Sequence, residues 1–268
     1  MGFFSFLFKR KKPKEIKLGL ALGSGGAKGF AELGALYAFE QNGISFDIIA
    51  GTSIGSIIGA FYADGYTSTD IMELLKTVNP AEITNVFMLQ MDTIGLFNVI
   101  DKSIGNKNIE ELKKPFKAVA TELETGEQYV FTTGSVATAL CASSSYPPFF
   151  KPVVVGDKRM IDGAFTNSVP ADLVKDMGAD FIVGIDLANH EEKPSLINKI
   201  FPIYQSKVKT PWEAGYKNSD VMLHPNLSEY KSISFSQASE IYEIGYNCAI
   251  NAMPEIIKKI NALKNNSK

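Results

Sequence analysis

The stretch that decides the fold is FDIIAGTSIGSIIGAFYA, residues 46–63, in which an apolar run breaks and resumes as a small-residue, helix-like pattern. The break is Gly51-Thr52-Ser53-Ile54-Gly55, a G-x-S-x-G sequence. Such a turn from strand to helix places a serine hydroxyl at the edge of a sheet, and its glycines let neighbouring backbone pass closely. The helix start offers free N–H groups to an anion formed at Ser53. The alternative is a strand-to-helix turn that happens to contain serine.

A glycine loop precedes this turn. Residues 17–22 read as a strand, residues 23–29 (GSGGAKG) as a loop, and a helical pattern then runs to residues 42–43. A dinucleotide-binding loop needs G-x-G-x-x-G, but Lys28 holds the third glycine position, and a Walker A loop is also absent. The two turns lie in adjacent βα units and are expected to open on the same sheet edge. One would supply a nucleophile and the other an oxyanion hole built from backbone N–H groups.

Strands and helices alternate along most of the chain, which predicts a three-layer α/β fold with a central, largely parallel sheet. Gly156-Asp157 is a tight-turn signal between two short strands and makes the sheet mixed. The final helical pattern is expected to break just before Pro254. The expected strands are 116–120, 128–131, 153–155, 159–161 and 181–185, and the expected helices are 68–78, 136–143, 168–177 and 235–263.

The composition favours one domain, residues 18–268, because 268 residues with 45% hydrophobic content supply one large core. Cys141 and Cys248 lie far apart and give neither C-x-x-C spacing nor a disulfide framework, so a reducing, cytoplasmic compartment is expected. No apolar run approaches the roughly 20 residues that span a bilayer. We therefore expect a soluble or peripheral protein.

Residues 1–17 form a separate segment that is expected to be flexible. They hold six Lys or Arg residues against one acid, Glu15, and the basic run is preceded by Phe3, Phe4, Phe6, Leu7 and Phe8. A signal peptide carries its positive charge ahead of its apolar region, so this order does not predict secretion. The side chains of residues 3–14 suit an anionic membrane surface, at about 1 kcal/mol per basic residue. The alternatives are peripheral binding at the inner membrane face and a solvated, disordered tail.

Two segments between the motifs are candidates for an acyl-chain surface. Residues 86–97 are rich in methionine and aromatic side chains with weak periodicity, which suits an irregular apolar groove, and ordinary helix packing is the alternative. Residues 146–150 contain two prolines and no charge, so they are expected to wall the site.

A serine hydroxyl is a weak nucleophile and needs a base, which is usually histidine. The chain has two histidines, His190 and His224. A triad of Ser53, then Asp162 or Asp186, then either histidine follows the chain order of α/β-hydrolases and is one mechanistic alternative. Neither histidine lies at a spacing that indicates a site by itself.

Three motifs in order resemble those of the patatin-like phospholipase family. Ser24-Gly25-Gly26-Ala27-Lys28-Gly29 resembles its G-G-G-x-R/K-G loop, Gly51-Thr52-Ser53-Ile54-Gly55 its nucleophile turn, and Asp162-Gly163-Ala164 its D-G-A/G motif. The resemblance covers roughly residues 18–187 and is greatest to short bacterial members. The chain departs from the pattern at Ser24, where many members have glycine, and at Lys28, where many have arginine. Lysine keeps the charge but lacks the bidentate fork, so a phosphate group would be held more loosely.

This resemblance implies a patatin-like fold and a lipid acyl hydrolase, a phospholipase or esterase that works through an acyl-serine intermediate. In that family the aspartate itself activates the serine, which implies Ser53 as nucleophile and Asp162 as base. The other residues that the resemblance implies are Gly25 and Gly26 for the oxyanion, with Lys28, Gly51, Gly55 and Gly163 supporting the motifs.

The implied partners are a lipid ester and, through residues 3–14, a membrane surface. No metal, organic cofactor or nucleic acid is expected, and the sequence assigns no oligomeric state. A second alternative to the dyad enzyme is a catalytically idle lipid-binding or adaptor protein with the same fold.

Overall fold

The structure is a computed structural model that describes residues 15–77, 91–188, 190, 207–232 and 235–266. Its strands are β1 (Leu18–Leu22), β2 (Ile48–Thr52), β3 (Phe116–Glu122), β4 (Gln128–Phe131), β5 (Val153–Val155), β6 (Lys158–Asp162), β7 (Phe181–Ile185) and β8 (Val221–Leu223). Its α-helices are α1 (Phe30–Gln41), α2 (Ile54–Ala63), α3 (Ser68–Thr77), α5 (Ile94–Ile104), α6 (Val136–Ser143), α7 (Ala171–Asp176), α9 (Glu213–Asn218) and α10 (Ala238–Asn266). Short 3₁₀ helices are η1 (Gly26–Gly29), η2 (Ile109–Glu111), η3 (Gly163–Phe165) and η5 (Phe235–Gln237).

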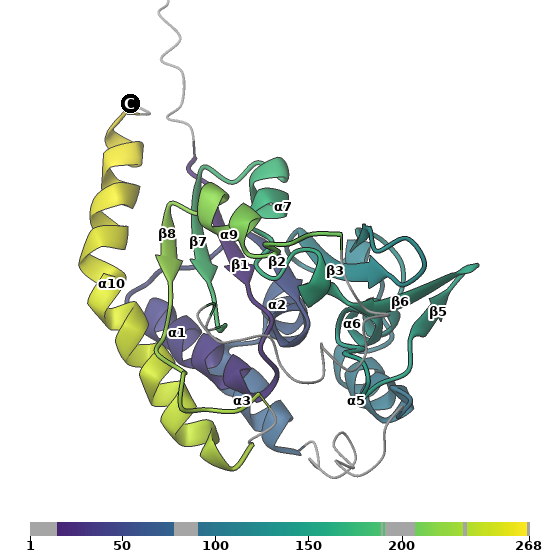
Figure 1. The fold of residues 1–268 in the computed structure, drawn as a ribbon. Helices are drawn as coiled ribbons and strands as arrows, with labels where there is room; N and C mark the ends of the chain where they lie inside the picture. The colour runs from purple at the N-terminus through teal and green to yellow at the C-terminus, as the bar shows by residue number, and fades with distance from the viewer. Residues whose placement is uncertain (1–14, 78–90, 189, 191–206, 233–234, 267–268) are drawn as a thin grey trace, which may run out of the picture.

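The described strands form one eight-stranded sheet in the order β5-β6-β3-β2-β1-β7-β8, with β4 paired to β3 (Figure 1). The strands from β3 to β8 in this order pair in parallel, whereas β4 and β6 run antiparallel to β3, and β5 runs antiparallel to β6. The prediction of a mixed, mostly parallel α/β sheet is confirmed. Because the parallel strands point the same way, the turns that follow β1, β2 and β7 lie at one edge of the sheet, its carboxyl edge.

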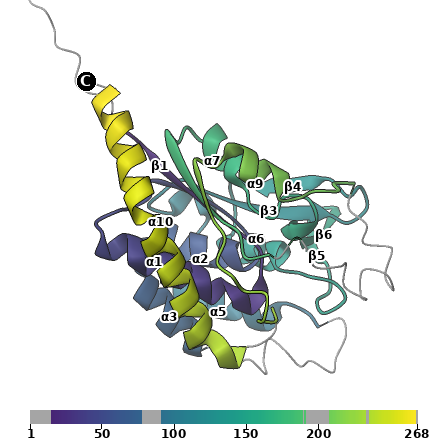
Figure 2. The same cartoon turned by 60° about the vertical axis from the view of Figure 1, so that its left-hand side comes forward.

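Helices cover both faces of the sheet (Figure 2). One face carries α7 and α9, and the other carries α1, α2, α6 and α10. Side chains alternate between the faces along each strand. In β1, Leu20 and Leu22 enter the larger core beneath α1 and α2, whereas Ala21 enters the smaller core beneath α7. The three layers place the strand ends between two sets of helices.

The last helix, α10, crosses α1 at a pair of glycines. A Cβ added to Gly34 of α1 would lie 2.0 Å from the backbone oxygen of Tyr242, and a Cβ added to Gly245 of α10 would lie 1.9 Å from that of Ala31. Only glycine allows two backbones to approach this closely. Figures 1 and 2 both show α10 lying along α1. The helix α1 is therefore held in place by α10.

The expected break at Pro254 is wrong. The helix α10 continues without interruption from Ala238 to Asn266, with Pro254 inside it. An interior proline costs roughly 3 kcal/mol. Apolar side chains are buried on both sides of it, Met253 directly before and Ile256 soon after, and we infer that their packing outweighs this cost.

The predicted start of α7 is also wrong, because the helix begins at Ala171 rather than at residue 168. The backbone of Ser168 is engaged elsewhere. Its N–H donates to the oxygen of Pro211 and its oxygen accepts the N–H of Ser24, both at 2.9 Å. These contacts hold the segment before α7 against the glycine loop.

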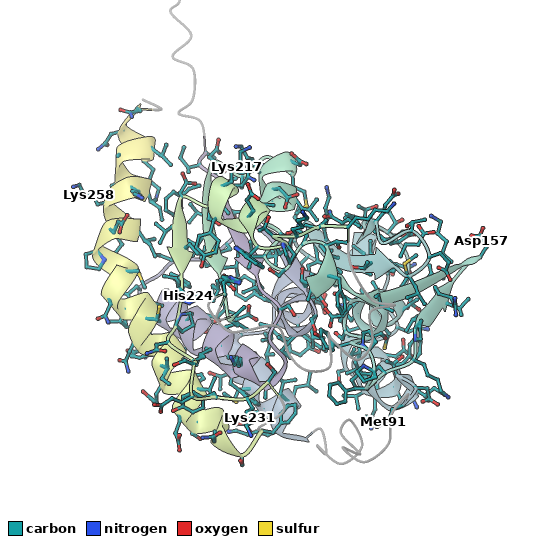
Figure 3. The ribbon with its side chains drawn as sticks, in the orientation of Figure 1. Met91, Asp157, Lys217, His224, Lys231 and Lys258 are labelled. Atoms are coloured by element: carbon teal, nitrogen blue, oxygen red, sulfur yellow. The ribbon has the colours of Figure 1, made fainter. Side chains whose placement is uncertain are left out.

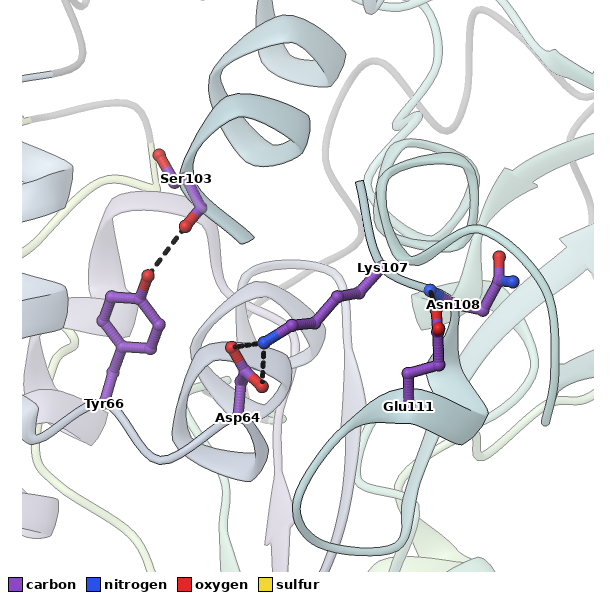
Figure 4. Close-up of polar contacts among 6 residues, drawn as sticks. All are labelled: Asp64, Tyr66, Ser103, Lys107, Asn108 and Glu111. Carbon is purple, nitrogen blue, oxygen red and sulfur yellow. Dashed lines mark hydrogen bonds and ion pairs between the residues drawn. The ribbon is translucent and has the colours of Figure 1, made fainter. Parts of the chain in front are cut away.

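A buried ion pair joins the end of α2 to the segment after α5 (Figure 4). Lys107 Nζ lies 2.7 Å from both carboxylate oxygens of Asp64. The side chain of Asp64 is 5% exposed and that of Lys107 is 36% exposed. Beside this pair the hydroxyl of Tyr66 donates to the backbone oxygen of Ser103 at 2.7 Å. The helix that follows Ser53 is thus fixed at its far end.

The described chain enters the sheet at the edge opposite the strand-to-helix turns. The N–H of Leu18 donates to Asp47 Oδ2 at 2.8 Å, and the N–H of Lys17 donates to Asp180 Oδ2 at 3.0 Å. Residues 1–14, which include the segment 3–14, and residues 86–90 lie outside the described residues, so the tail and its boundary with a domain 18–268 stay predictions. In the part of the chain that is described, no helix has the length and apolar character needed to cross a bilayer.

Candidate active site

Ser53 lies in the turn between β2 and α2, at the carboxyl edge of the sheet. Its backbone has φ 56° and ψ −125°, a left-handed conformation that residues other than glycine rarely adopt. The flanking glycines are needed because backbone packs against them. A Cβ on Gly51 would lie 2.2 Å from the oxygen of Gly55, and a Cβ on Gly55 would lie 2.6 Å from the oxygen of Gly23. Strain of this kind persists only where surrounding structure enforces it, and it collects at active sites.

The strand register places Asp162 beside Ser53. Thr52 pairs with Val119 of β3, and Asp162, the last residue of β6, pairs with Ala120, the next residue of β3. Ser53 Oγ donates a hydrogen bond to Asp162 Oδ2 at 2.7 Å, across 109 residues of sequence. Ser53 is 7% exposed and Asp162 is 1% exposed. The contact between hydroxyl and carboxyl is therefore largely shielded from water.

Backbone contacts fix the orientation of Asp162. Its Oδ1 accepts the N–H of Ala164 at 2.8 Å, and its own N–H donates to the oxygen of Ser145 at 3.1 Å. Gly163 follows in a place where a Cβ would lie 2.3 Å from the oxygen of Val119. Only a glycine fits between Asp162 and β3 without moving the carboxyl.

Burial raises the pKa of Asp162 from 3.8 to about 7, although the hydrogen bonds from Ser53 and Ala164 act in the opposite direction. Near neutral pH this carboxyl can therefore both accept and return a proton. Burial also raises the pKa of Tyr146, and the negative charge of Asp162 adds to the effect. The phenol of Tyr146 accordingly stays uncharged next to the carboxyl.

The glycine loop contains backbone donors that no described protein group accepts. The N–H of Ala27 donates to the oxygen of Ser232 at 2.7 Å. Gly26 has φ +57°, and a Cβ there would lie 2.3 Å from the same oxygen. Among the described residues the N–H groups of Gly25 and Gly26 have no hydrogen-bond acceptor. Adjacent free N–H groups of this kind can bind an anion.

Both ends of this loop contact the first turn of α2. At one end the oxygen of Gly23 lies against Gly55, and at the other a Cβ on Gly29 would lie 2.3 Å from the Ile54 side chain. Lys28, whose charge the sequence singled out, is only 6% exposed within the loop. The loop and the Ser53 turn therefore form one packed unit.

Ser143 is a site residue that sequence reasoning did not identify. Its Oγ accepts the N–H of Ser53 at 2.9 Å, and its side chain is fully buried at the end of α6. The only sequence signal is the run of three serines at residues 143–145, which is common at helix ends. Because this bond occupies the N–H of Ser53, that group is not available to a ligand.

The segment with two prolines lies beside these residues. The ring of Tyr146 stacks on that of Phe165 with centroids 5.1 Å apart. Met91 donates its N–H to the oxygen of Phe149 at 2.8 Å and accepts the N–H of Lys151 at 2.7 Å. The described end of segment 86–97 therefore runs alongside residues 146–150, and the acyl-chain groove stays a prediction.

Both histidines gather around Asp186, which follows β7, and not around Ser53. His190 Nε2 lies 2.5 Å from Asp186 Oδ2, and His224 Nδ1 lies 3.9 Å from the same oxygen. The ring of His190 stacks on Trp212 with centroids 4.1 Å apart. Figure 3 shows His224 beside the ends of β7 and β8. The aspartate and histidines of the alternative triad are thus brought together, but the hydroxyl of Ser53 bonds Asp162 instead.

The site offers a hydroxyl, a carboxyl that titrates near neutrality and, in the adjoining glycine loop, two N–H groups that have no acceptor among the described residues. Such a set can remove a proton from the hydroxyl and bind negative charge beside it. Among the residues that the structure describes, no three His, Cys, Asp or Glu side chains are grouped to hold a metal ion.

Comparison with known proteins identifies the family. The model of the patatin-like phospholipase family matches residues 20–175, which is more than half of the chain and includes Ser53, Asp162 and the glycine loop. The chain belongs to the patatin-like phospholipase family. The family resemblance inferred from the three motifs is therefore confirmed.

Two curated relatives of this chain are distant in sequence. The chain is 27% identical over 273 residues to "Patatin-like phospholipase domain-containing protein 7" of Mus musculus, covering 85% of this chain and 20% of that protein. It is 26% identical over 294 residues to "Lysophospholipase NTE1" of Pyricularia oryzae, covering 95% of this chain and 19% of that protein. The chain thus spans about a fifth of the length of the curated relatives it matches.

The patatin-like fold is also found in a solved structure. The crystal structure of VipD from Legionella pneumophila aligns with 91% of this chain and 67% of that chain, at a TM-score of 0.60 and 15% identity. This likeness concerns the fold alone, and the predicted fold class is confirmed.

Proposed function

We propose that this patatin-like chain is a serine hydrolase of lipid carboxylic esters, a phospholipase or esterase, with Ser53 as nucleophile and Asp162 as base. The observation that carries the proposal is the 2.7 Å hydrogen bond from Ser53 Oγ to Asp162 Oδ2 in a site largely closed to water. The names of the relatives, a phospholipase domain protein and a lysophospholipase, support a lipid ester as the substrate.

In the first half of the proposed reaction the serine becomes acylated. Asp162 takes the proton of Ser53 Oγ while Oγ attacks the carbonyl carbon of the ester. Negative charge develops on the carbonyl oxygen, and the N–H groups of Gly25 and Gly26 donate to it. When the tetrahedral intermediate collapses, the alcohol part of the lipid leaves with the proton from Asp162, and the acyl group stays on Ser53.

In the second half, water releases the fatty acid. Asp162 takes a proton from a water molecule while the oxygen of that water attacks the acyl carbon. Asp162 returns the proton to Ser53 Oγ when the bond between the acyl group and serine breaks. A pKa of about 7 suits both transfers near neutral pH. The scheme uses no metal ion and no organic cofactor.

The geometry favours the dyad over the triad with histidine. A histidine base must lie within hydrogen-bond reach of the serine that it activates. His190 is instead bonded to Asp186 and stacked on Trp212. Ser53 Oγ already has a carboxylate partner of its own.

A fluorophosphonate probe, which reacts with activated serines, tests the proposal. We expect the probe to label Ser53 in the wild-type chain and to leave Ser53→Ala unlabelled. Hydrolysis of phospholipids, lysophospholipids or monoacylglycerols should fall by about 1,000-fold or more in this variant. Ser68→Ala, at a buried serine at the start of α3, is the control and should keep both labelling and hydrolysis. A folded wild-type chain that is neither labelled nor active would instead be the idle lipid-binding protein.

A further inference from the structure

Another buried carboxyl, that of Glu32, lies behind the glycine loop. Glu32 is in the first turn of α1 and is fully buried. Its Oε1 accepts the N–H of Gly23 at 2.7 Å. Its Oε2 is buried without a hydrogen-bond partner among the described residues. Burying an acid without a paired cation is costly. Among the described residues, the hydrogen bond from Gly23 is the polar contact that offsets part of this cost.

Gly23 is the residue at which the loop leaves β1, and it is confined on several sides. A Cβ on Gly23 would lie 2.6 Å from the backbone oxygen of Ile185 in β7, and the oxygen of Gly23 itself lies against Gly55 in α2. Gly25 follows two residues later, within about 7 Å along the chain. A shift of Gly23 therefore moves the donors at Gly25 and Gly26 relative to the turn that holds Ser53.

The surroundings of Glu32 disfavour the charged form of its carboxyl. Burial raises its pKa well above the ordinary value, the hydrogen bond from Gly23 lowers it, and the negative charge of Asp186 raises it again. Asp186 is itself paired with His190. The neutral form suits this place, because a negative charge behind the loop donors would repel an oxyanion bound to them.

Among the described residues, no other charged side chain is bonded to the carboxyl of Glu32. Lys28 lies four residues before Glu32, but the ion pairs of the described residues do not join the two. On α10, which packs along α1, the rings of Tyr242 and Tyr246 face Tyr37 at the other end of the helix.

We propose that Glu32 is a positioning residue that holds the N–H of Gly23 and so sets the distance between the loop donors, Gly25 and Gly26, and the reacting oxygen. This inference rests on the proposed function. The oxyanion forms only on the way to the transition state, so the contact affects the chemical step and not the binding of the ester. Its loss lowers kcat and leaves KM almost unchanged.

Two substitutions separate the hydrogen bond from the space that the side chain fills. Glu32→Gln keeps the size and the accepting oxygen and carries no charge, whereas Glu32→Met keeps the size and removes the acceptor. With a p-nitrophenyl ester at pH 7 we expect E32Q to keep kcat within about twofold and E32M to lose about 10- to 100-fold, with KM within about threefold in both. Rescue by glutamine is the readout that a merely space-filling role would not give. Glu32→Ala replaces E32M in the comparison if the methionine variant does not fold.

Glu40, in the same helix, provides a matched control. Its Oε1 accepts the N–H of Ser68 at 2.9 Å and its Oε2 accepts the hydroxyl of Ser68 at 2.6 Å, away from the glycine loop. Glu40→Met removes a comparable contact between a carboxyl and a backbone N–H, and it should lower stability but keep kcat within about twofold at a temperature where it is folded.

Three results would overturn the inference while the proposed function stands. In the first, E32M has the same kcat as the wild type. In the second, kcat falls equally in E32M and E40M. In the third, kcat falls as far in E32Q as it does in E32M. A folded wild-type chain that hydrolyses no ester and is not labelled by fluorophosphonate overturns the proposed function, and the inference with it. The activity of the wild-type chain thus distinguishes the two failures.

Discussion

Replacing Asp162 by asparagine should abolish hydrolysis and at the same time stabilise the fold. Asparagine keeps the shape of the side chain, and its Oδ1 can still accept the N–H of Ala164. It cannot take the proton of Ser53, so acylation should fall by about 1,000-fold or more. It also has no charge, so the folded chain no longer keeps an ionised carboxyl away from water above pH 7.

The size of the stabilisation follows from the pKa of Asp162 in the two states. The pKa is about 7 in the folded chain against 3.8 for an ordinary aspartate. About three pKa units at 1.36 kcal/mol each correspond to ~4 kcal/mol. Because the folded pKa is the higher one, the stability linked to this group is fully present below pH 3.8 and is lost as the pH rises to about 7. The variant D162N lacks this loss, so its unfolding free energy should exceed that of the wild type at pH 8. Relaxation of the folded structure around the charged carboxyl reduces the full effect, so we expect a difference of about 2–4 kcal/mol.

Denaturant unfolding of both proteins between about pH 4 and pH 8 measures this effect, because the other titrating groups cancel in the difference. Ester hydrolysis is measured on the same samples. Asp176→Asn, at an exposed position of α7, is the control and should leave hydrolysis unchanged. Hydrolysis by D162N at the wild-type rate would remove Asp162 as the base. A stability difference that does not grow with pH would mean that the carboxyl is not a buried acid with a raised pKa.

Further predictions concern the histidines, the buried ion pair and the tail. His190→Gln and His224→Gln should each keep hydrolysis within about threefold, because Ser53 Oγ bonds Asp162; a folded variant as inactive as Ser53→Ala would restore the triad. Lys107→Met leaves the carboxylate of Asp64 buried without its cation and should cost about 1–3 kcal/mol in unfolding free energy, whereas Lys76→Met in the exposed pair with Glu73 should cost less than about 1 kcal/mol. Equal costs would contradict a structural role for the buried pair. A chain that begins at Glu15 should sediment with anionic vesicles less than the full chain does, through the loss of about 1 kcal/mol per basic residue near the surface at low salt. Equal sedimentation would leave residues 3–14 without a membrane role.

The strand-to-helix turns could be predicted from the sequence because their signals are local. Gly51 and Gly55 are required where backbone crosses backbone, so the pattern around Ser53 marks the turn itself. In the structure β2 ends at Thr52 and α2 begins at Ile54. The alternation of strands and helices predicted the fold class for the same reason, since each element carries its own periodicity.

Contacts between distant residues could not be predicted in this way. The bond between Ser53 and Asp162 depends on how β2 and β6 register along β3, and the residues alone left Asp186 as an alternative. Ser143 and Glu32 belong to no motif, and a serine at the end of a helix or an acid at its start has ordinary local roles. At Pro254 the local rule failed because burial along the whole of α10 opposed it. In each case tertiary packing decided what local preference could not.

The glycine crossing of α10 over α1 joins two helices that are synthesised far apart in time. Translation delivers β1, the glycine loop and the Ser53 turn long before α10, and domains complete their packing only when the missing segment emerges. Until then the face of α1 at Ala31 and Gly34 lacks the helix that covers it. The nascent chain would therefore hold every residue of the proposed dyad while the helix that carries Glu32 is not yet fixed. We expect ester hydrolysis to begin only after α10 has been synthesised and has closed over α1.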